Sequence, residues 1–298
     1  MNSKARVIFI HLLVLIPIIG LSQNPIDSLT LLTSSNNLEE RIVAHIELSK
    51  EYSKQRNYDS TFYNAQRAID LAEESSNEMK ALALHRMGIS HYKWDNSTES
   101  IMFLNKALLV PNGLEADKQV DANVVLGINH SVHSQHVKAI EYYRQALPLR
   151  DAAAEISGRD YSFIYNNLAI TYLDLKEVDS SRKYHDLCLE GRLKTGNMYG
   201  IGQTYNNIGT FFYETGMYDS ALYYFEIGHI TRIKAGTVPW TGILESKINI
   251  GKALLALDRL QEAEDTLVMC YDSSARIGNF ALEIRAAEQL NMLYKKSR

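Results

Sequence analysis

Three histidines, His130, His133 and His136, form the densest group of side chains that could bind a metal or carry a proton. His130 and His133 are three residues apart, a spacing that puts both on one face of a helix. Imidazole nitrogens are common zinc ligands, so metal binding is one interpretation. No cysteine or carboxylate accompanies them at ligand spacing. A packing role is therefore favoured, and we expect no metal and no cofactor.

Sequence patterns typical of catalysis are missing from the rest of the chain. It contains no glycine-rich phosphate loop, no H-E-x-x-H, no G-x-S-x-G and no cysteine placed beside a histidine. The net charge of −4, with both signs mixed along the chain, offers no basic face for nucleic acid. We therefore expect a protein that binds a partner and catalyses nothing.

A short pattern returns seven times along the chain: an apolar residue, a small residue next to it, and an aromatic or bulky residue three positions later. The copies are Leu48-Ser49-Tyr52, Met87-Gly88-His91, Leu126-Gly127-His130, Leu168-Ala169-Tyr172, Ile208-Gly209-Phe212, Ile250-Gly251-Leu254 and Leu290-Asn291-Tyr294. Consecutive small residues are 39 to 42 positions apart. One helical hairpin cannot bury its apolar face alone, so this period predicts a solenoid of stacked helical repeats.

A second set of columns follows each copy at constant offsets. Nine residues after the aromatic position comes a small residue, four later a bulky one, and three beyond that another small one. In the fifth copy these are Ala221, Phe225 and Gly228, and in the sixth Ala263, Leu267 and Cys270. Offsets of three and four define one helix face, and small residues mark the places where two helices cross closely. Each repeat is therefore predicted to be two antiparallel helices, A and B.

These residues resemble the tetratricopeptide repeat (TPR). The fifth copy, YNNIGTFFYETGMYDSALYYF, follows the family pattern of Leu-Gly-x-x-Tyr, Gly-x-Tyr, Ala and Phe, with Phe212 in the Tyr position. The resemblance covers roughly residues 38 to 298, and copies of this length are closest to the extended repeats of kinesin light chains and of bacterial peptide-sensing regulators. It implies an all-α, right-handed TPR superhelix of about six helical hairpins plus a terminal helix.

The only two cysteines, Cys188 and Cys270, occupy the same column in repeats four and six. Packed helical hairpins advance about 10 Å per repeat, so two steps separate the sulfurs by roughly 20 Å. A disulfide needs Cα atoms within about 7 Å of each other. Both cysteines are therefore predicted to be free and to pack as small core residues.

The resemblance also implies where a ligand binds. In the family, helix A lines a concave groove, and the residues one and two places before the Leu position point into it. In repeats four to six these are Asn166 and Asn167, Asn206 and Asn207, and Ile248 and Asn249. In TPR proteins that hold extended peptides, asparagine at such sites fixes the peptide backbone, because its amide donates and accepts hydrogen bonds. The alternative is that these amides satisfy neighbouring groups of the chain itself.

Other groove positions refine the predicted partner. Phe163, Tyr213 and Ile248 are expected to give apolar contacts to the side chains of a bound peptide. Among all the groove positions only Arg86 is basic, so a clamp for acidic C-termini is not supported. The predicted partner is a protein or an extended peptide.

The N-terminal segment has the order of features typical of an export signal. Lys4 and Arg6 precede the apolar run from Val7 to Ile19, and Gly20 and Ser22 are small residues at the positions that a signal peptidase reads. We therefore interpret residues 1–22 as a signal peptide, residues 23–37 as a capping helix (Ile26 to Leu32) and linker, and residues 38–298 as the solenoid. An uncleaved N-terminal anchor is the alternative.

The last repeat supplies a helix A only. Phe280, Ile284, Ala287, Leu290 and Tyr294 form its main apolar stripe, whereas Leu282 and Met292 lie off it. These additional apolar residues favour a sensor that continues beyond Arg298 over a terminal cap. The resemblance to periplasmic TPR regions of membrane-anchored regulators implies a periplasmic or envelope-associated ligand-sensing module in a bacterium. A free-standing envelope scaffold and an enzyme are the alternatives.

Removal of residues 1–22 is the first testable expectation. The basic start, the apolar run and the small residues at Gly20 and Ser22 place the cut before Gln23. Intact-mass analysis of the envelope fraction measures this directly. A mass that retains Met1 to Ser22 would contradict cleavage and favour the anchor.

Overall fold

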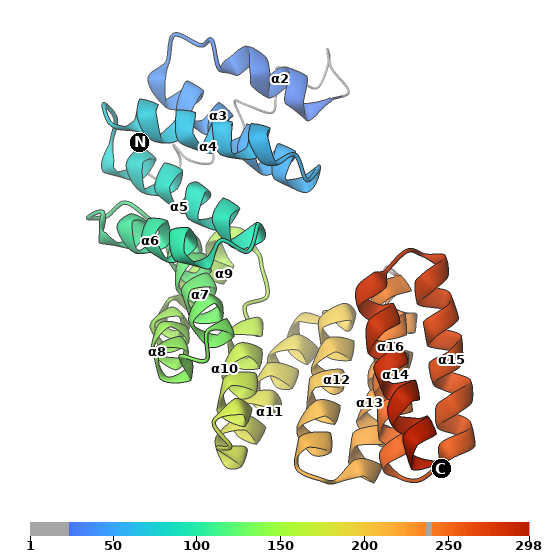
Figure 1. Cartoon of the computed structure of the whole chain (residues 1–298). Helices are drawn as coiled ribbons and strands as arrows, with labels where there is room; N and C mark the ends of the chain where they lie inside the picture. The colour runs from blue at the N-terminus through green and yellow to red at the C-terminus, as the bar shows by residue number, and fades with distance from the viewer. Residues whose placement is uncertain (1–23, 237–239, 298) are drawn as a thin grey trace. The chain divides into compact units, whose positions relative to one another are not determined.

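The computed structural model describes residues 24–236 and 240–297, and every regular element in these ranges is a helix (Figure 1). The chain divides into two compact units, Met1–Arg159 and Asp160–Arg298. Within each unit, consecutive helices pack against one another as hairpins. The predicted all-α solenoid is therefore confirmed.

Unit 1 begins with the short helix α2 (Pro25–Leu32), which lies where the sequence predicts a helix and contacts α3. Three hairpins follow: α3 (Leu38–Lys54) with α4 (Tyr58–Ala72), α5 (Asn77–Lys93) with α6 (Ser97–Leu109), and α7 (Ala116–Val132) with α8 (His136–Ala146). The 3-10 turn η1 (Leu147–Leu149) and the helix α9 (Arg150–Ser157) complete the unit.

Unit 2 contains three more hairpins and a final helix. The hairpins are α10 (Phe163–Asp174) with α11 (Val178–Thr195), α12 (Met198–Glu214) with α13 (Tyr218–Lys234), and α14 (Trp240–Ala256) with α15 (Leu260–Arg276). The helix α16 (Phe280–Lys296) packs against α14 and α15. Within each unit, the first helix of a hairpin, helix A, also contacts the helix A that follows it.

The two helices of a hairpin meet at the small and bulky columns. A Cβ atom added to Gly209 would lie 2.5 Å from Cδ1 of Phe225, and one added to Gly127 would lie 2.3 Å from Cε1 of Tyr143. The same clash occurs between Gly251 and Leu267. A side chain at these positions has no space, because the bulky residue of helix B already occupies it. The predicted close crossing of helices A and B is confirmed.

The aromatic column of helix A stacks on an aromatic residue of helix B twelve positions later. Tyr172 stacks on Tyr184 with ring centroids 5.4 Å apart. His91 stacks in the same way on Phe103, at 5.5 Å and an interplanar angle of 5°, and His130 on Tyr142, at 5.3 Å and 6°. Imidazole is planar and offers the same stacking face as phenol. The two histidines that replace tyrosine in the repeat pattern therefore keep the packing of this column.

The turn from helix A to helix B contains a residue in the left-handed conformation in each hairpin. These residues are Arg56, Asp95, Ser134, Lys176, Gly216 and Asp258, with φ between 56° and 80°. The amide of the following residue closes the turn on the carbonyl of the aromatic column, as from Met217 N to Phe212 O at 2.9 Å. A Cβ atom makes this conformation costly by roughly 1–2 kcal/mol. Only the fifth repeat uses glycine there.

Helix α9 is the element that the sequence did not predict. Pro148 lies in η1 directly after α8 and has no amide N–H for a continuing helix, and α9 ends at Gly158, whose φ is 66°. Ala153 is buried, and α9 packs against α7. The following helix A, α10, starts late and has 12 residues, whereas α12 has 17. The boundary between the units, at Arg159 and Asp160, lies directly after α9 and Gly158.

The inward face of α16 differs from the prediction. Leu282, Ala286 and Leu293 are buried against α14 and α15, whereas Phe280 is 75 % exposed and Ile284 is 59 % exposed. Phe280, Ile284 and Tyr294 of the predicted main stripe thus lie on the outer face, whereas Leu290 of the same stripe packs against the core. Leu282, which the sequence places off the stripe, belongs to the core. The physical reason is that the stripe contacts a helix B in the other repeats, and no helix B follows α16 within the described residues.

Exchanging the turn residues should change stability in opposite directions. Arg56→Gly relieves a strained backbone and should raise the free energy of unfolding by about 0.5–1 kcal/mol, after the entropy cost of glycine is subtracted. Gly216→Arg should lower it by a similar amount. Both positions are exposed, and a Cβ atom at Gly216 would meet no other atom within 4 Å, so packing is unaffected. Urea denaturation measures the change, and an unaltered stability for Gly216→Arg would contradict the account.

Candidate functional site

Two buried arginines at the ends of helices B fix the next helix A in unit 2. Arg192 of α11 is 4 % exposed, and its Nη1 donates to Gly200 O at 2.6 Å and to Thr204 Oγ1 at 2.8 Å in α12. Arg232 of α13 is 3 % exposed, and its Nη1 donates to Gly242 O at 2.6 Å in α14. A buried guanidinium needs such partners. These contacts fix the first turns of α12 and α14, and with them the asparagines that follow.

In unit 2, asparagine side chains connect α12 to α10 and α14 to α12. Asn207 Nδ2 donates to Asn166 Oδ1 at 2.5 Å, and Asn249 Nδ2 donates to Asn206 Oδ1 at 2.9 Å. Asn166, Asn206 and Asn249 are between 6 % and 9 % exposed. The structure therefore brings four of the five predicted asparagines together, but in pairs that bond to each other across neighbouring repeats. We call these two pairs the amide rungs.

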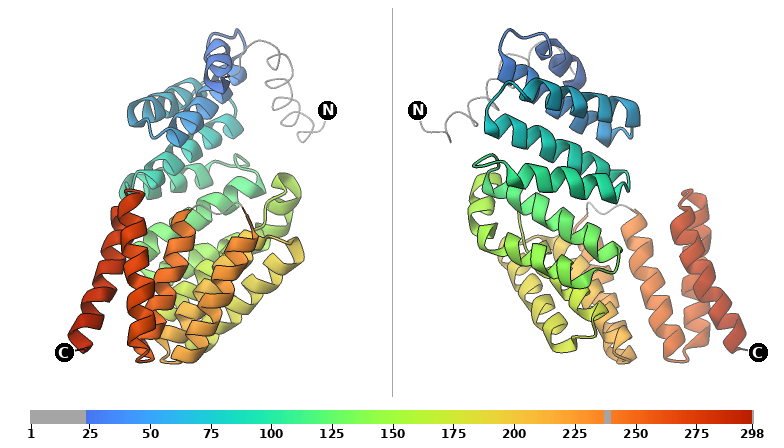
Figure 2. Two further views of the ribbon diagram at one scale, coloured as in Figure 1. Left: turned by 90° about the vertical axis from the view of Figure 1, so that its right-hand side faces the viewer. Right: turned by 60° about the vertical axis from the view of Figure 1, so that its left-hand side comes forward.

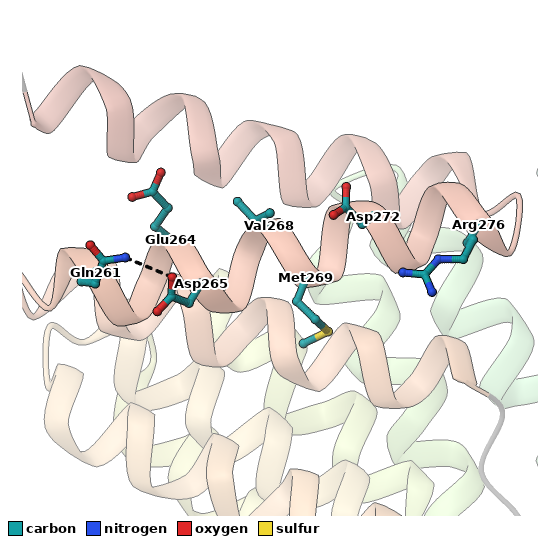
Figure 3. Close-up of a pocket in the computed structure, with 7 residues that line it drawn as sticks. All are labelled: Gln261, Glu264, Asp265, Val268, Met269, Asp272 and Arg276. Atoms are coloured by element: carbon teal, nitrogen blue, oxygen red, sulfur yellow. Dashed lines mark hydrogen bonds between the residues drawn. The ribbon is translucent and has the colours of Figure 1, made fainter.

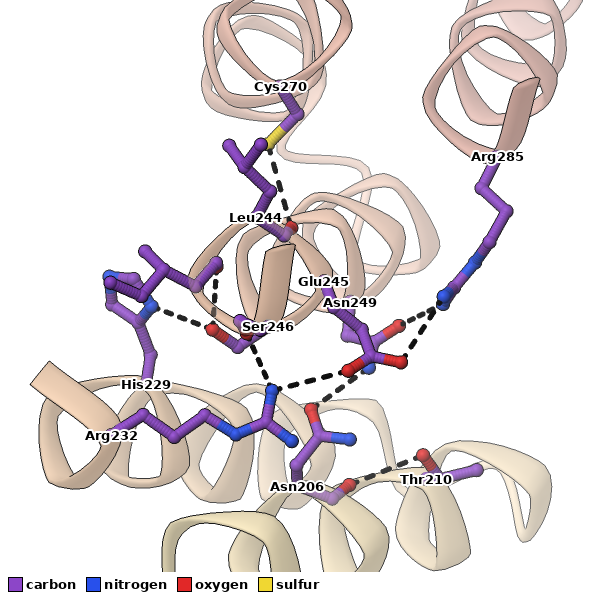
Figure 4. Close-up of polar contacts among 12 residues, drawn as sticks. Asn206, Thr210, His229, Arg232, Leu244, Glu245, Ser246, Asn249, Cys270 and Arg285 are labelled. Carbon is purple, nitrogen blue, oxygen red and sulfur yellow. Dashed lines mark hydrogen bonds and ion pairs between the residues drawn. The ribbon is translucent and has the colours of Figure 1, made fainter. Parts of the chain in front are cut away.

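A charged group extends the second rung toward α16 (Figure 4). Arg285 Nη2 donates to Asn249 Oδ1 at 3.3 Å, and its Nη1 lies 3.4 Å from Glu245 Oε1. The other oxygen of Glu245 lies 3.4 Å from Nη1 of the buried Arg232. Glu245 thus bridges two arginines from different helices, and Asn249 is held from both sides.

The fifth predicted asparagine, Asn167, has a different environment. Its side chain is half-buried on α10, and no side-chain hydrogen bond to it forms within the described part of the chain. Its backbone carbonyl accepts from Thr171 Oγ1 at 2.9 Å. The described residues therefore leave the amide of Asn167 without a hydrogen bond. The NH2 groups of Asn166 and Asn206 are likewise unused by the described residues.

The three predicted apolar contacts do not share one environment. Phe163 is half-buried at the start of α10, and its ring lies 5.5 Å from that of Tyr161. Tyr213 is half-buried on α12, with the Lys252 ammonium 3.9 Å from its ring centroid. Ile248 is 2 % exposed and packs in the core with Leu244 and Leu267. The prediction that Ile248 offers a contact surface is wrong, because its helix turns it toward α15.

One further column of the same face was not singled out from the sequence. Phe163, Gln203, Glu245 and Arg285 all lie five residues before the Leu position of their repeats. Gln203 Oε1 accepts from Arg192 Nη2 at 3.3 Å, as Glu245 accepts from Arg232. An alignment of the repeats places these four residues in one column. Along the chain the residue in this column changes from aromatic to polar and then to charged.

In unit 1, a residue one place before the Leu position also connects two neighbouring hairpins. Arg86 occupies the column of Asn207 and Asn249, is 7 % exposed, and reaches back to the preceding hairpin. Its Nε donates to Ser49 Oγ at 3.0 Å and its Nη2 to Ser49 O at 3.2 Å. Burial lowers the pKa of Arg86 to about 10. The only basic residue at the groove positions is therefore turned into the interface between two repeats.

The histidine group identified in the sequence does not converge. His130 stacks on Tyr142 and its Nδ1 lies 2.6 Å from Gln135 Oε1, while His133 is exposed at the end of α7. His136 begins α8. Residues 24–236 and 240–297 contain no group of three or more histidine, cysteine or acidic side chains placed to hold a metal ion.

Both cysteines are free and buried, as predicted. Cys188 Sγ lies 3.4 Å from Thr204 Oγ1, and Cys270 belongs to the core cluster with Leu267. Burial raises the pKa of Cys270 to about 11 and also raises that of Cys188. A thiol with a raised pKa and no access to solvent is a poor nucleophile.

A surface hollow lies on α15, away from the amide rungs (Figure 3). All seven of its lining residues come from this one helix B, and Glu264, Asp265 and Asp272 make it acidic. Gln261 Nε2 donates to Asp265 Oδ1 at 3.0 Å along the helix. No described helix is long and apolar enough to cross a membrane.

His185 of α11 is a buried histidine without hydrogen bonds. It is 1 % exposed, and neither ring nitrogen has a partner among the described residues. It fills the bulky column where other repeats have Leu104, Tyr143, Phe225 or Leu267. Burial lowers the pKa of His185 to about 4, and the positive charge of Arg182 acts in the same direction. The ring is therefore neutral in the folded protein near neutral pH.

Comparison with known proteins supports the repeat assignment. Residues 164–195, which comprise most of α10 and α11, match the model of a tetratricopeptide repeat family. A search of curated protein sequences finds no match to the chain.

Several solved structures share the fold at low sequence identity. The quorum sensor NprR from B. thuringiensis in its apo form has a TM-score of 0.68 at 14 % identity, over 89 % of this chain and 73 % of NprR. A structure of NprR with its cognate peptide NprX has a TM-score of 0.63 at 14 % identity, over 90 % and 76 % of the two chains. The aspartyl phosphate phosphatase F from Bacillus subtilis scores 0.60 at 14 % identity, over 92 % and 75 %.

The neutral state of His185 should make stability depend on pH. The unfolded chain takes up a proton near the ordinary histidine pKa of 6.5, whereas the folded chain does so only near 4. The folded state therefore loses stability as the pH falls from about 6.5 to 4, by roughly 3 kcal/mol for this residue. Urea denaturation of the wild type and of His185→Leu, at pH 7.5 and pH 4.5, measures the loss.

The leucine variant should be less sensitive to acid and at least as stable at pH 7.5, because two unpaired ring nitrogens are removed. The exposed residue His133 supplies the control, and His133→Gln should keep the pH dependence of the wild type. An unchanged pH dependence in His185→Leu would contradict the assignment.

Proposed function

We propose that this tetratricopeptide-repeat solenoid is a non-catalytic module that binds an extended peptide or a peptide segment of a protein partner through the helix A face of unit 2. The observation that carries the proposal is the row of asparagines on α10, α12 and α14. Their amides fix adjacent repeats to one another and still retain hydrogen-bonding groups for a ligand.

The chemistry of this row suits a peptide backbone. Asn167 keeps its whole amide, and the NH2 groups of Asn166 and Asn206 make no bond within the described residues. Amide groups at a spacing of one repeat can donate to carbonyls and accept from N–H groups of an extended chain. Phe163 on α10 and Tyr213 on α12 are half-buried, so parts of both rings remain for contacts with a ligand. Because the rungs fix the amides before a ligand arrives, binding costs little side-chain entropy.

The role in the cell is part of the same proposal. The N-terminal order of basic residues, apolar run and small residues favours export to the cell envelope of a bacterium. NprR, a quorum sensor of similar fold, has a cognate peptide, which favours a ligand-sensing part of a signalling system. A free-standing envelope scaffold or assembly factor is the alternative, and a transmembrane run with an output domain encoded directly downstream would favour the sensor.

An enzyme is the alternative from another class, and one structure of similar fold is named as a phosphatase. The described residues favour a non-catalytic protein, because His91 and His130 stack on aromatic rings and both thiols are buried. Reproducible turnover that is lost on substitution of His130 or His133 would favour the enzyme.

The asparagine row can be tested by its effects on affinity and stability separately. Peptides selected from a displayed library of linear 12-residue sequences against the chain from Gln23 serve as ligands. Asn167→Ala should weaken binding about two- to tenfold, as expected for one lost hydrogen bond, and leave the melting temperature unchanged. Asn207→Ala combined with Asn249→Ala should lower both affinity and melting temperature, because it also breaks the two rungs.

The control for these variants is Glu262→Ala, an exposed change on helix B of the sixth repeat. It should keep the affinity of the wild type. If selection enriches no peptide, or if the enriched peptides bind Asn167→Ala and the double variant as tightly as the control, the helix A face is not the binding site.

A further inference from the structure

The three turns that lead from a helix B to the next helix A in unit 2 share one composition. Each combines an exposed basic residue with large apolar residues, and the segments 193–199, 233–240 and 275–281 contain no acidic residue in the sequence. The cations are Lys194, Lys234 and Arg276, and the apolar residues that begin the following helices include Met198, Tyr199 and Trp240. We call these residues the turn edge.

The repeat geometry places the three cations in a row. Each lies nine residues after the bulky residue of its helix B, and these bulky residues are His185, Phe225 and Leu267. A glycine follows two residues after each cation and has φ between 67° and 69°: these are Gly196, Gly236 and Gly278. The backbone therefore leaves each helix B in the same way, and neighbouring cations are separated by one repeat, roughly 10 Å.

The turn edge lies at one end of unit 2, and the turns from helix A to helix B lie at the opposite end (Figure 2). The helices A of this unit pack side by side, α12 on α10 and α14 on α12, and each is one half of an antiparallel hairpin. The turns that precede them are therefore neighbours. A row across successive repeats can contact one extended surface with several side chains at once.

The apolar side chains of the turn edge are exposed although their helices are packed. Trp240 is 70 % exposed, and Met198 and Tyr199 are 42 % and 43 % exposed. Helix α12 packs against α11 and α13, and α14 packs against α13, α15 and α16. The exposure therefore comes from the position at the helix ends and not from an uncovered helix face. Leu193 and Ile233, which precede two of the cations, are also exposed and enlarge the apolar surface.

The equivalent turns of unit 1 have the opposite character. Residues 73–79 and 110–117 contain acidic residues but no basic or aromatic one. The acidic residues are Glu73, Glu74, Glu78, Glu115 and Asp117. The helix dipole favours acidic side chains at helix N-termini, yet the first turns of α12 and α14 have none. The basic and aromatic composition is thus a property of unit 2, and the fold of the turn does not require it.

Two of the three cations form no ion pair within the described part of the chain. Lys194 pairs with Glu190 at 2.6 Å, whereas Lys234 and Arg276 have no such partner there. Asp272 lies one turn before Arg276 on α15, and both line the hollow of that helix. Positive charge therefore remains for a partner at Lys234 and Arg276, next to the exposed Trp240.

A phospholipid surface matches this combination of rings and cations. Indole and phenol rings locate at the headgroup level of bilayers, because each ring has an apolar body and a polar group. Lysine and arginine lay their apolar stems along apolar surface while their charges reach anionic headgroups. Basic residues beside Trp and bulky apolar residues are the composition of segments that lie on membrane surfaces.

We propose that the turn edge binds the surface of an anionic lipid bilayer, with Trp240 and Tyr199 among the headgroups and the three cations at the lipid phosphates. The contact needs no membrane-spanning helix. Tyr199 and Asn207 are eight residues apart on α12, roughly 12 Å along the helix. The turn edge is therefore separate from the asparagine row, and lipid binding does not depend on the proposed function.

Co-sedimentation with vesicles tests the proposal. The chain from Gln23 is used, because the apolar run of residues 7–19 would bind lipid by itself. Vesicles of equal parts phosphatidylcholine and phosphatidylglycerol should bind the wild type at least about tenfold more tightly than vesicles of phosphatidylcholine alone. Added salt should weaken the binding, because it screens the cations.

Charge reversal tests the two unpaired cations. Lys234→Glu combined with Arg276→Glu should weaken binding to the anionic vesicles by at least about tenfold. The matched control is Lys138→Glu combined with Lys183→Glu, which makes the same change in net charge at exposed positions of α8 and α11. The control should bind nearly as tightly as the wild type. Circular dichroism confirms that each variant is folded.

Tryptophan fluorescence locates the contact. The chain has two tryptophans, and Trp94→Phe leaves Trp240 as the only one. Its emission should shift to shorter wavelength with anionic vesicles, and lipids with brominated acyl chains should quench it. Trp240→Ser should weaken binding, whereas Tyr223→Ser, which removes an exposed ring on α13, should not.

Three results would overturn the proposal: a wild type that binds anionic vesicles no better than neutral ones; a reversal at Lys234 and Arg276 with no more effect than its control; or Trp240 emission that vesicles leave unchanged when they bind the chain. A wild type that does not bind vesicles but forms dimers that Trp240→Ser abolishes would also overturn it and would assign the turn edge to a second copy.

Discussion

The close crossing of helices A and B is the constraint on which the rest of the structure depends. At Gly209 a Cβ atom would lie 2.5 Å from the Phe225 ring, so the two backbones meet where only glycine or a small residue fits. This contact fixes the rotation of helix A about its axis. That rotation decides which residues enter the core, such as Ile208, and which turn toward the neighbouring helix A, such as Asn206.

The polar contacts between repeats follow from this rotation. Asn206 and Asn249 face each other from adjacent helices, and burial requires that such groups be hydrogen-bonded. Arg192 and Arg232 supply the second connection, because each bonds to the first turns of the next helix A. The result is a row of side chains held by the fold before any ligand binds. Asn167 differs, since no described neighbour uses its amide.

The sequence predicts the architecture because packing repeats every 39 to 42 residues, so the columns of Gly209 and Phe225 are visible without coordinates. It does not predict α9, which lies between Pro148 and Gly158 in a repeat of ordinary length. It also leaves the asparagine row ambiguous, because an amide suits a neighbouring side chain as well as a peptide. The burial of Ile248 depends on the exact rotation of α14 about its axis. The spacing of small and bulky residues in the sequence does not define this rotation closely enough to tell a buried position from a neighbouring exposed one.

The central claim is that the helix A face of unit 2 binds a peptide. Hydrogen–deuterium exchange of the chain from Gln23, with and without a peptide selected from a library, tests it most directly. Exchange in the middle of a helix requires opening of that helix, and a ligand bound across α10, α12 and α14 stabilises these three against opening. The account predicts that protection is concentrated in these helices A, with α13 and α15 less affected. Protection concentrated in the helices B, or confined to unit 1, would contradict it.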